Sequence, residues 1–194
     1  MQNRHILHFL TLWGIEIRTA CITFVKPYTL INMQIRNAKT EEIDAIMNVF
    51  EVARQFMHKT GNARQWIDGY PSKELILGNI RNDGLYVCLS DEELIAGVFY
   101  FKVETDNTYA KIYDGAWLND NPYGVVHRIA SNGTQRGIGD ACLQWCLKQC
   151  GNIRVDTHRD NTVMQKILRR NGFHQCGIIY VANGTERIAY QKCL

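Results

Sequence analysis

A glycine-rich turn between a strand-like run and a helix-like run contains the residue types best suited to chemistry. Residues 124–140 read Gly-Val-Val-His-Arg-Ile-Ala-Ser-Asn-Gly-Thr-Gln-Arg-Gly-Ile-Gly-Asp, and an amphipathic helical pattern follows at once. Glycine lets the backbone approach a ligand closely, and the first N–H groups of a helix have no partners within the helix. This order of elements therefore predicts a binding site for a phosphate group.

Two common phosphate motifs do not fit this turn. A nucleoside-triphosphate loop needs Gly-Lys-Ser or Gly-Lys-Thr, and residues 124–140 contain no lysine. The dinucleotide pattern needs glycine or alanine three residues after Gly139, where this chain has Cys142. The turn is therefore expected to bind a phosphate-bearing ligand of another class.

Hydrophobic periodicity predicts the elements that position this turn. Helical spacing is expected at 40–57, 72–81, 138–150 and 161–170. Strands are expected at 33–37, 85–89, 94–103, 109–113, 124–130, 152–157, 176–181 and 187–191. Asn183-Gly184 is a strong hairpin signal between the last two strands. The order predicts an α/β domain of the α+β type, with a mixed, mostly antiparallel sheet flanked by helices.

Length and charge limit the possible functions. A chain of 194 residues with 46% hydrophobic residues fits one globular domain. Of the net charge of +3, the terminal segment 1–32 contributes Arg4, Arg18 and Lys26 against Glu16, so residues 33–194 carry only +1. This near-neutral balance argues against a nucleic-acid partner. No stretch of residues 1–32 has about 18 uncharged residues, so no membrane partner is expected.

The N-terminal segment and the cysteines add two further expectations. Met33 begins a run typical of a first strand, so residues 1–32 are interpreted as an extension or a misassigned translation start, and 33–194 as the domain. Seven cysteines, an odd number, favour free thiols and a cytoplasmic location. Cys142, Cys146 and Cys150 lie on one helical face, and small core residues are the favoured interpretation over a metal site, since further ligands are lacking.

Three blocks of the sequence resemble the GCN5-related N-acetyltransferase (GNAT) family, and their order covers residues 33–194. Val125–Ala130 resembles the strand that receives the pantetheine arm, Thr134–Gly139 the pyrophosphate loop, and Asn161–Phe173 the later helix that ends in Gly-Phe. The resemblance implies a GNAT-like acyl-CoA N-acyltransferase fold with acetyl-CoA as cosubstrate. The residues that it implies for the coenzyme are Ile129, Ala130, Thr134, Gln135, Arg136, Gly137, Ile138, Gly139, Asp140 and Asn161.

The implied reaction is direct transfer of the acetyl group to a primary amine, on a small molecule or a peptide. It requires a base close to the amine, and His127, Asp156 and His158 are the candidates. Strand alternation places Asp156 and His158 on one face with Arg154. Ordinary structural roles are the competing interpretation for each of these residues. The sequence identifies neither the amine nor the oligomeric state, and a homodimer through an added strand or a shared sheet edge stays open.

The chain departs from the family pattern at two positions. Thr134 stands where the loop motif has Gln or Arg, a change that leaves the backbone donors in place. Leu168 stands where many members have a tyrosine that protonates the leaving thiolate. Another group or solvent must then protonate the thiolate. The alternative function is a catalytically weak module that binds or senses acyl-CoA.

Overall fold

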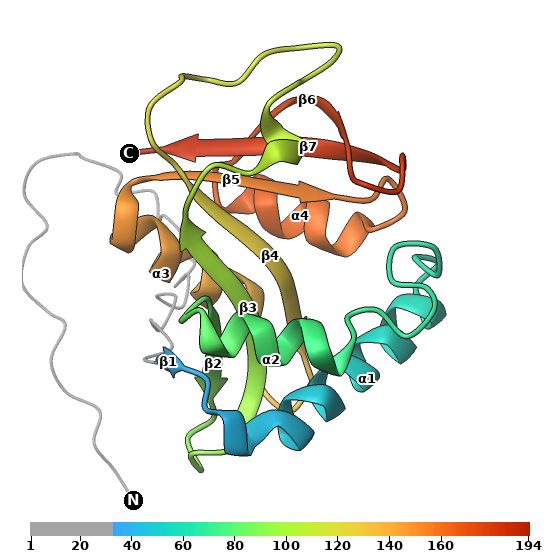
Figure 1. Ribbon diagram of the computed structural model, residues 1–194, viewed down its shortest axis with the longest axis vertical. Helices are drawn as coiled ribbons and strands as arrows, with labels where there is room; N and C mark the ends of the chain where they lie inside the picture. Colours follow the sequence, from blue (N-terminus) through green and yellow to red (C-terminus); the bar gives the residue numbers. More distant parts are fainter. Residues whose placement is uncertain (1–32) are drawn as a thin grey trace, which may run out of the picture. The chain divides into compact units, whose positions relative to one another are not determined.

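The computed structural model describes residues 33–194, so the expectation for residues 1–32 lies outside the described residues. Within that range the chain forms a single mixed sheet with helices between its strands (Figure 1). In chain order the elements are β1 (Gln34–Asn37), α1 (Ile43–Lys59), α2 (Lys73–Arg81), β2 (Leu85–Leu89), β3 (Ile95–Val103), β4 (Gly124–Ser131), α3 (Ile138–Cys150), β5 (Asn152–Thr157), α4 (Thr162–Arg170), β6 (His174–Tyr180) and β7 (Glu186–Cys193).

The sheet has the strand order β1-β2-β3-β4-β5-β7-β6. Every neighbouring pair is antiparallel except β4 and β5, which run parallel. The parallel pair follows from the crossover through α3, because parallel neighbours need a long connection. The predicted mixed, mostly antiparallel sheet is confirmed.

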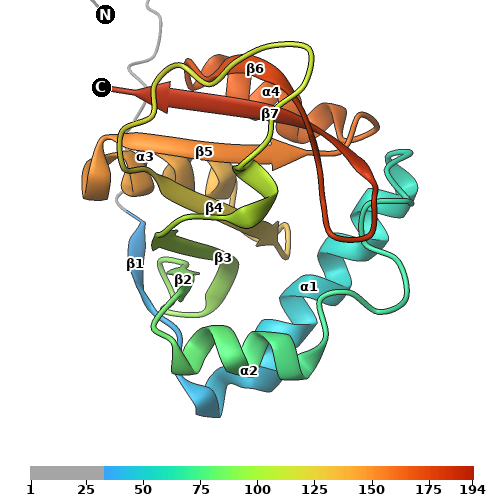
Figure 2. The same ribbon diagram turned by 45° about the horizontal axis from the view of Figure 1, so that its top comes forward.

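Two helical layers bury the two faces of the sheet (Figure 2). Helices α1 and α2 pack residues such as Phe50 and Ile76 against Val87 of the sheet. Helices α3 and α4 pack against a cluster that contains Cys88, the next residue of the same strand. Successive strand residues face opposite sides, so the two helical layers cover opposite faces.

Capping side chains set the starts of two helices. The Ser72 hydroxyl accepts the N–H of Leu75 at 3.2 Å ahead of α2. The Asn161 side chain accepts the N–H of Met164 at 3.0 Å ahead of α4. Such side chains satisfy donors that the helix leaves without partners.

The cysteines of α3 behave as core residues. Cys142 and Cys146 are buried, and the sulfur atoms of Cys88 and Cys142 lie 3.5 Å apart. Burial raises the pKa of the Cys142 thiol well above its ordinary value. In residues 33–194 no group of three metal-ligating side chains is gathered in a metal-site arrangement. The same range contains no helix with the length and apolar character needed to cross a bilayer.

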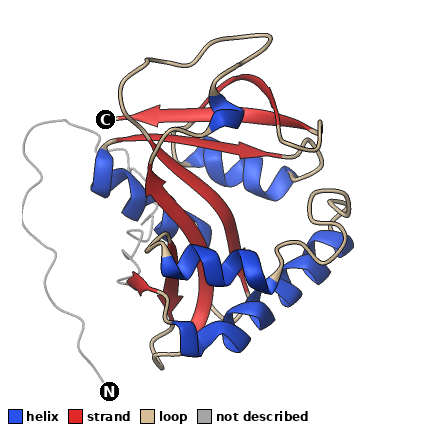
Figure 3. Ribbon diagram, viewed as in Figure 1, coloured by secondary structure: helices blue, strands red, loops and turns tan. Residues whose placement is uncertain are grey.

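The predicted strand at 109–113 is wrong. Residues 107–109 form a short 3-10 turn, and only Tyr113 makes a β-bridge, with Ile178 (Figure 3). The cause is Asp106, whose carboxylate accepts the Thr108 N–H at 2.8 Å and the Thr108 hydroxyl at 2.6 Å. These local bonds replace strand pairing. The segment packs the buried ring of Tyr109 onto the sheet.

Candidate functional site

Strands β4 and β5 pair over only three positions and then separate. Gly124, Val125 and Val126 pair with residues 153–155 of β5. Farther along, β4 remains paired only with β3, and β5 only with β7 (Figure 1). The edge of β4 at Ile129 and Ala130 therefore carries backbone groups that β5 does not pair. Such an edge can bind an extended ligand through main-chain hydrogen bonds.

A β-bulge interrupts β4 just after the point of separation. The pairs His127–Tyr100 and Ala130–Val98 enclose one residue on β3 but two on β4, namely Arg128 and Ile129. Arg128 adopts the left-handed conformation, with φ of 55°. A bulge redirects side chains, and three consecutive residues, His127 to Ile129, line the same cavity.

The cavity has a volume of about 660 Å³. Its walls come from segments far apart in the chain: the loop after α1, strands β4 and β5, the start of α4, and the turn between β6 and β7. Trp66 and Tyr70 contribute aromatic rings to these walls. The polar groups that reach it include Asp106, His127, Arg128, Asp156, Thr157 and Asn161.

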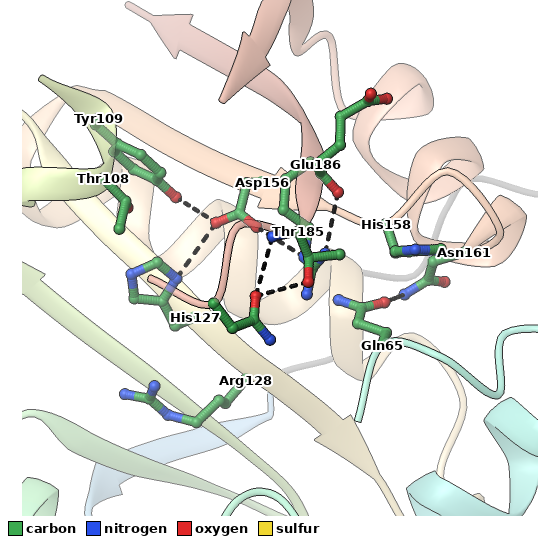
Figure 4. Close-up of polar contacts among 12 residues, drawn as sticks. Gln65, Thr108, Tyr109, His127, Arg128, Asp156, His158, Asn161, Thr185 and Glu186 are labelled. Atoms are coloured by element: carbon green, nitrogen blue, oxygen red, sulfur yellow. Dashed lines mark hydrogen bonds and ion pairs between the residues drawn. The ribbon is translucent and has the colours of Figure 1, made fainter. Parts of the chain in front are cut away.

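His127 stands between the carboxylates of Asp106 and Asp156, and Figure 4 shows its contact with Asp156. Its Nε2 lies 2.8 Å from Oδ2 of Asp106, and its Nδ1 lies 3.6 Å from Oδ1 of Asp156. Burial raises the pKa of Asp106, but hydrogen bonds from His127 and Thr108 outweigh that effect and lower the pKa to about 2. An ionised carboxylate only accepts. Nε2 therefore carries the hydrogen, which leaves the Nδ1 lone pair as the free acceptor of the neutral ring.

Asp156 is held by a second set of contacts. The Tyr109 hydroxyl donates to Oδ1 of Asp156 at 2.8 Å, and Nε of Arg187 lies 3.8 Å from Oδ2. Burial and the nearby Asp156 charge raise the pKa of Tyr109 well above its ordinary value. Tyr109 is therefore a permanent donor that orients the carboxylate.

The structure brings together two of the three candidate bases and places the third apart. His158 is buried, and its Nδ1 accepts the backbone N–H of Asp160 at 3.2 Å. It is not among the described residues that line the cavity. Arg154 of the same predicted face stacks on Trp117 and donates to the Asn119 carbonyl at 2.7 Å. Of the predicted polar face, only Asp156 reaches the cavity.

The turn before α3 has the geometry that the sequence predicts. The Asn132 side chain accepts from the N–H and hydroxyl of Thr134, at 3.0 and 2.7 Å. Gly137 is the N-cap residue, with φ of 81°, and makes no side-chain cap. The first-turn N–H groups of Ile138, Gly139 and Asp140 thus have no helical acceptor. Gln135 is half-buried and Arg136 is exposed.

Gly139 explains the close approach of α3 to α4. A Cβ at this position would stand 3.1 Å from Cδ1 of Ile167. The Asp140 side chain is bound to Arg170 and accepts from Nδ2 of Asn171 at 2.7 Å. Only the backbone of Asp140 is therefore available to a ligand at the helix start.

Three features of the cavity are not predicted by the sequence. Nδ2 of Asn161 donates to Oε1 of Gln65 at 2.9 Å, across 96 residues of chain. Thr157 is fully buried, and its hydroxyl has no hydrogen-bond partner among the described residues. Asp106 also lacked a sequence signal, because it lies in the segment predicted to lead into a strand.

Comparison with solved structures identifies the family. A GNAT-family acetyltransferase from Streptococcus agalactiae 2603 is 38% identical, with a TM-score of 0.75, and the match covers 84% of this chain and 95% of that chain. The chain belongs to the GNAT family of acetyltransferases. The GNAT resemblance in the sequence is therefore confirmed.

Two more distant GNAT structures share the fold. A GNAT-family acetyltransferase from Listeria monocytogenes 4b F2365 is 19% identical with a TM-score of 0.63, covering 84% of this chain and 95% of that chain. A GNAT phosphinothricin acetyltransferase from Sinorhizobium meliloti, solved in complex with AcCoA, is 16% identical with a TM-score of 0.56, covering 84% and 88%. No family model and no curated protein sequence matches the chain.

Proposed function

We propose that this GNAT chain transfers an acetyl group from acetyl-CoA directly to a primary amine inside the cavity. The observation that carries the proposal is the separation of β4 from β5 beside a helix start with unpaired donors. The distant neighbour that contains AcCoA shares the fold and supports this choice of coenzyme.

The chain offers two kinds of group to the coenzyme. The backbone of Ile129 and Ala130, on the edge of β4 that β5 leaves, would meet the pantetheine arm. The N–H groups from Gln135 to Asp140 would meet the pyrophosphate, favoured by the helix dipole. Thr134 braces the turn through Asn132, Arg136 supplies an exposed cation, and Asn161 faces the cavity. Acetyl-CoA would supply the activated thioester.

His127, paired with Asp156, is the proposed proton acceptor. With Nε2–H donated to Asp106, Nδ1 is the ring atom available to the amine, directly or through one water. The two carboxylates beside the ring would attract an ammonium and stabilise the imidazolium that forms. As the carbon–nitrogen bond forms and the carbon–sulfur bond breaks, the amine proton passes to His127 and the electron pair leaves on sulfur.

Thr157 is the proposed hydrogen-bond donor to that sulfur. The family's usual tyrosine position is Leu168, which is buried in the core. Thr157 of β5 is one of the residues that line the cavity, and its buried hydroxyl has no hydrogen-bond partner among the described residues. A buried hydroxyl without a partner is costly, and a ligand atom would remove that cost. The thiolate would then take its proton from solvent as the product leaves.

The proposal is tested by titration calorimetry with acetyl-CoA, followed by a thiol-release assay over a panel of primary amines. Saturable binding and amine-dependent release of coenzyme A are expected. Binding of acetyl-CoA without release of coenzyme A for any amine would favour the alternative function, a module that binds or senses acyl-CoA. Absence of binding by the folded protein would overturn both functions.

The free thiols and the open substrate question lead to two smaller proposals. Six cysteines of the described residues are unpaired, which supports a cytoplasmic location because such thiols persist in a reducing compartment. The acceptor is proposed to be a small-molecule or peptide amine, since the cavity encloses a volume suited to such groups.

A further inference from the structure

Arg128 carries a positive charge on the cavity wall that no carboxylate of the described residues balances. Its Nη1 bonds to the Tyr70 hydroxyl at 3.1 Å and its Nη2 to Oδ1 of Asn79 at 2.7 Å. Its guanidinium stacks over the Tyr100 ring, 4.9 Å from the centroid. All three partners are neutral as groups. Its Nε is buried and has no acceptor among the described residues.

The other charges of the cavity are balanced in a different way. Asp106 bonds to His127, and Asp156 accepts from Tyr109 with Arg187 on its other side. Asp68 also lines the cavity but is exposed. Arg128 is thus a cation on the cavity wall whose neighbours among the described residues hold it in place but do not neutralise its charge. Guanidinium groups bind carboxylates through paired hydrogen bonds.

The bulge brings this cation beside the proposed base. In a regular strand His127 and Arg128 would face opposite sides, whereas both line the cavity here. Both also lie against one ring: the His127 and Tyr100 centroids are 6.1 Å apart. The left-handed conformation of Arg128 strains the backbone, and a regular strand would avoid this strain.

We infer that Arg128 binds a carboxylate of the acceptor, so that the substrate is an amine that also carries a carboxylate group. This inference rests on the proposed function, because it places the amine at His127. The carboxylate would bond to the free N–H groups of the guanidinium while the amine nitrogen faces Nδ1 of His127. Tyr70 and Asn79 would hold the guanidinium in position beforehand.

The alternative on the same observations is a purely structural role, in which Arg128 ties β4 to α2 through Asn79. That role predicts lower stability on substitution but no change in the choice between acceptors. The ratio of two acceptors that differ only in the carboxylate therefore separates the two roles.

The test measures kcat/KM by thiol release for matched acceptors: L-phenylalanine and L-phenylalaninamide, β-alanine and β-alaninamide, and glycylglycine and its amide. The wild type is expected to favour the carboxylate member of at least one pair by on the order of 10- to 100-fold, the range for a hydrogen bond to a charged group. In Arg128→Gln this ratio should fall toward one, and in Arg128→Lys it should recover in part.

Arg81→Gln is the matched control. This exposed arginine of α2 bonds to the Leu77 carbonyl and lies outside the cavity lining, so the same loss of charge should leave the ratio unchanged. Calorimetry with acetyl-CoA on each variant shows whether the coenzyme site is intact.

Each outcome decides one question. Equal kcat/KM within every pair, or a preference for the amide, overturns the inference about Arg128. Measurable turnover of these amines would still support the proposed acetyltransferase function. A wild-type preference that survives in Arg128→Gln assigns recognition to another residue and also overturns it. Failure of every amine, with or without acetyl-CoA binding, would refute the proposed function and the inference with it.

Discussion

The two ends of the proposed site use different chemical groups, backbone N–H groups at one end and side chains at the other. The turn at residues 132–140, the coenzyme corner, is one continuous segment whose donors are backbone N–H groups. The cavity that we assign to the acceptor gathers side chains from segments far apart in the chain, among them Asp106, His127 and Asp156. A site built from backbone N–H groups depends on the backbone conformation and tolerates most side-chain substitutions. A site built from side chains can lose function through a single substitution.

The largest expected effect separates His127, at the cavity end, from His158, which lies outside the cavity. His127→Ala should lower kcat by about 100- to 10,000-fold, the usual contribution of a positioned acid or base. Its acetyl-CoA Kd should stay within about threefold, because the coenzyme corner does not use this side chain. The matched variant His158→Ala removes a ring that bonds to Asp160 outside the cavity. Single-turnover kinetics and calorimetry give both quantities, and a larger kcat loss for His158→Ala would reverse the assignment.

The coenzyme corner should respond to a change at a glycine. Gly137→Asp places a carboxylate at the start of α3, where it repels a pyrophosphate, and we expect the acetyl-CoA Kd to rise about 100-fold. Gly151→Asp is the matched control at the other end of the same helix, where the glycine is also left-handed, with φ of 69° against 81° at Gly137.

Both glycine variants pay a similar conformational cost of about 1 kcal/mol. Urea unfolding measures that cost, and calorimetry measures the Kd. If both variants weaken acetyl-CoA binding equally, the effect comes from the fold, and the assignment of the corner is lost.

The same contrast explains how much could be predicted from the sequence. The strand, turn and helix of the coenzyme corner could be predicted, because a glycine turn before an amphipathic helix is a local pattern that residues 124–150 contain in full, whereas its binding of the coenzyme stays a prediction. Most strands and all four described helices were predicted for the same reason. The cavity was predicted only in part: His127 and Asp156 were named, but Asp106, Gln65 and Thr157 were not.

The missed residues have a common physical cause. Asp106 meets His127 because a 3-10 turn, stabilised by its own carboxylate, replaces the strand that alternation suggested. Arg128 faces the cavity because of a bulge at a residue that is neither glycine nor asparagine, so its type gives no signal. The Asp106–His127 contact and the bulge between β3 and β4 join segments far apart in the chain, and a single sequence does not contain such contacts as a local pattern.

A smaller effect should come from Thr157 at the boundary between the two ends. Thr157→Val keeps the shape but removes the hydroxyl, and we expect kcat to fall about tenfold through the loss of one hydrogen bond to the leaving sulfur. Thr157→Ser should retain most of the rate because it keeps the donor. KM for acetyl-CoA should change little in either variant. Equal rates for Val and wild type would remove Thr157 from the mechanism.

The smallest effect concerns stability and pH at the cavity end. The pKa of Asp106 is about 2 in the folded protein against an ordinary value of 3.8, because hydrogen bonds from His127 and Thr108 overcome the opposing effect of burial. A lowered folded pKa means that the ionised form stabilises the fold. That contribution is present above about pH 4 and is lost as the pH falls from about 4 to 2.

Asp106→Asn tests this contribution directly. The amide keeps an oxygen that can accept from Thr108 but loses the charge beside His127, so the free energy of unfolding should fall by about 1 kcal/mol at pH 6. Urea unfolding at intervals from pH 6 to 2 should show the difference between wild type and variant shrinking below pH 4. The acetyl-CoA Kd should not change at any pH where both proteins are folded, because the carboxylate acts on side chains of the cavity and the corner binds through its backbone. A difference in stability that persists unchanged to pH 2 would mean that packing around Asp106, and not its charge, holds the imidazole in place.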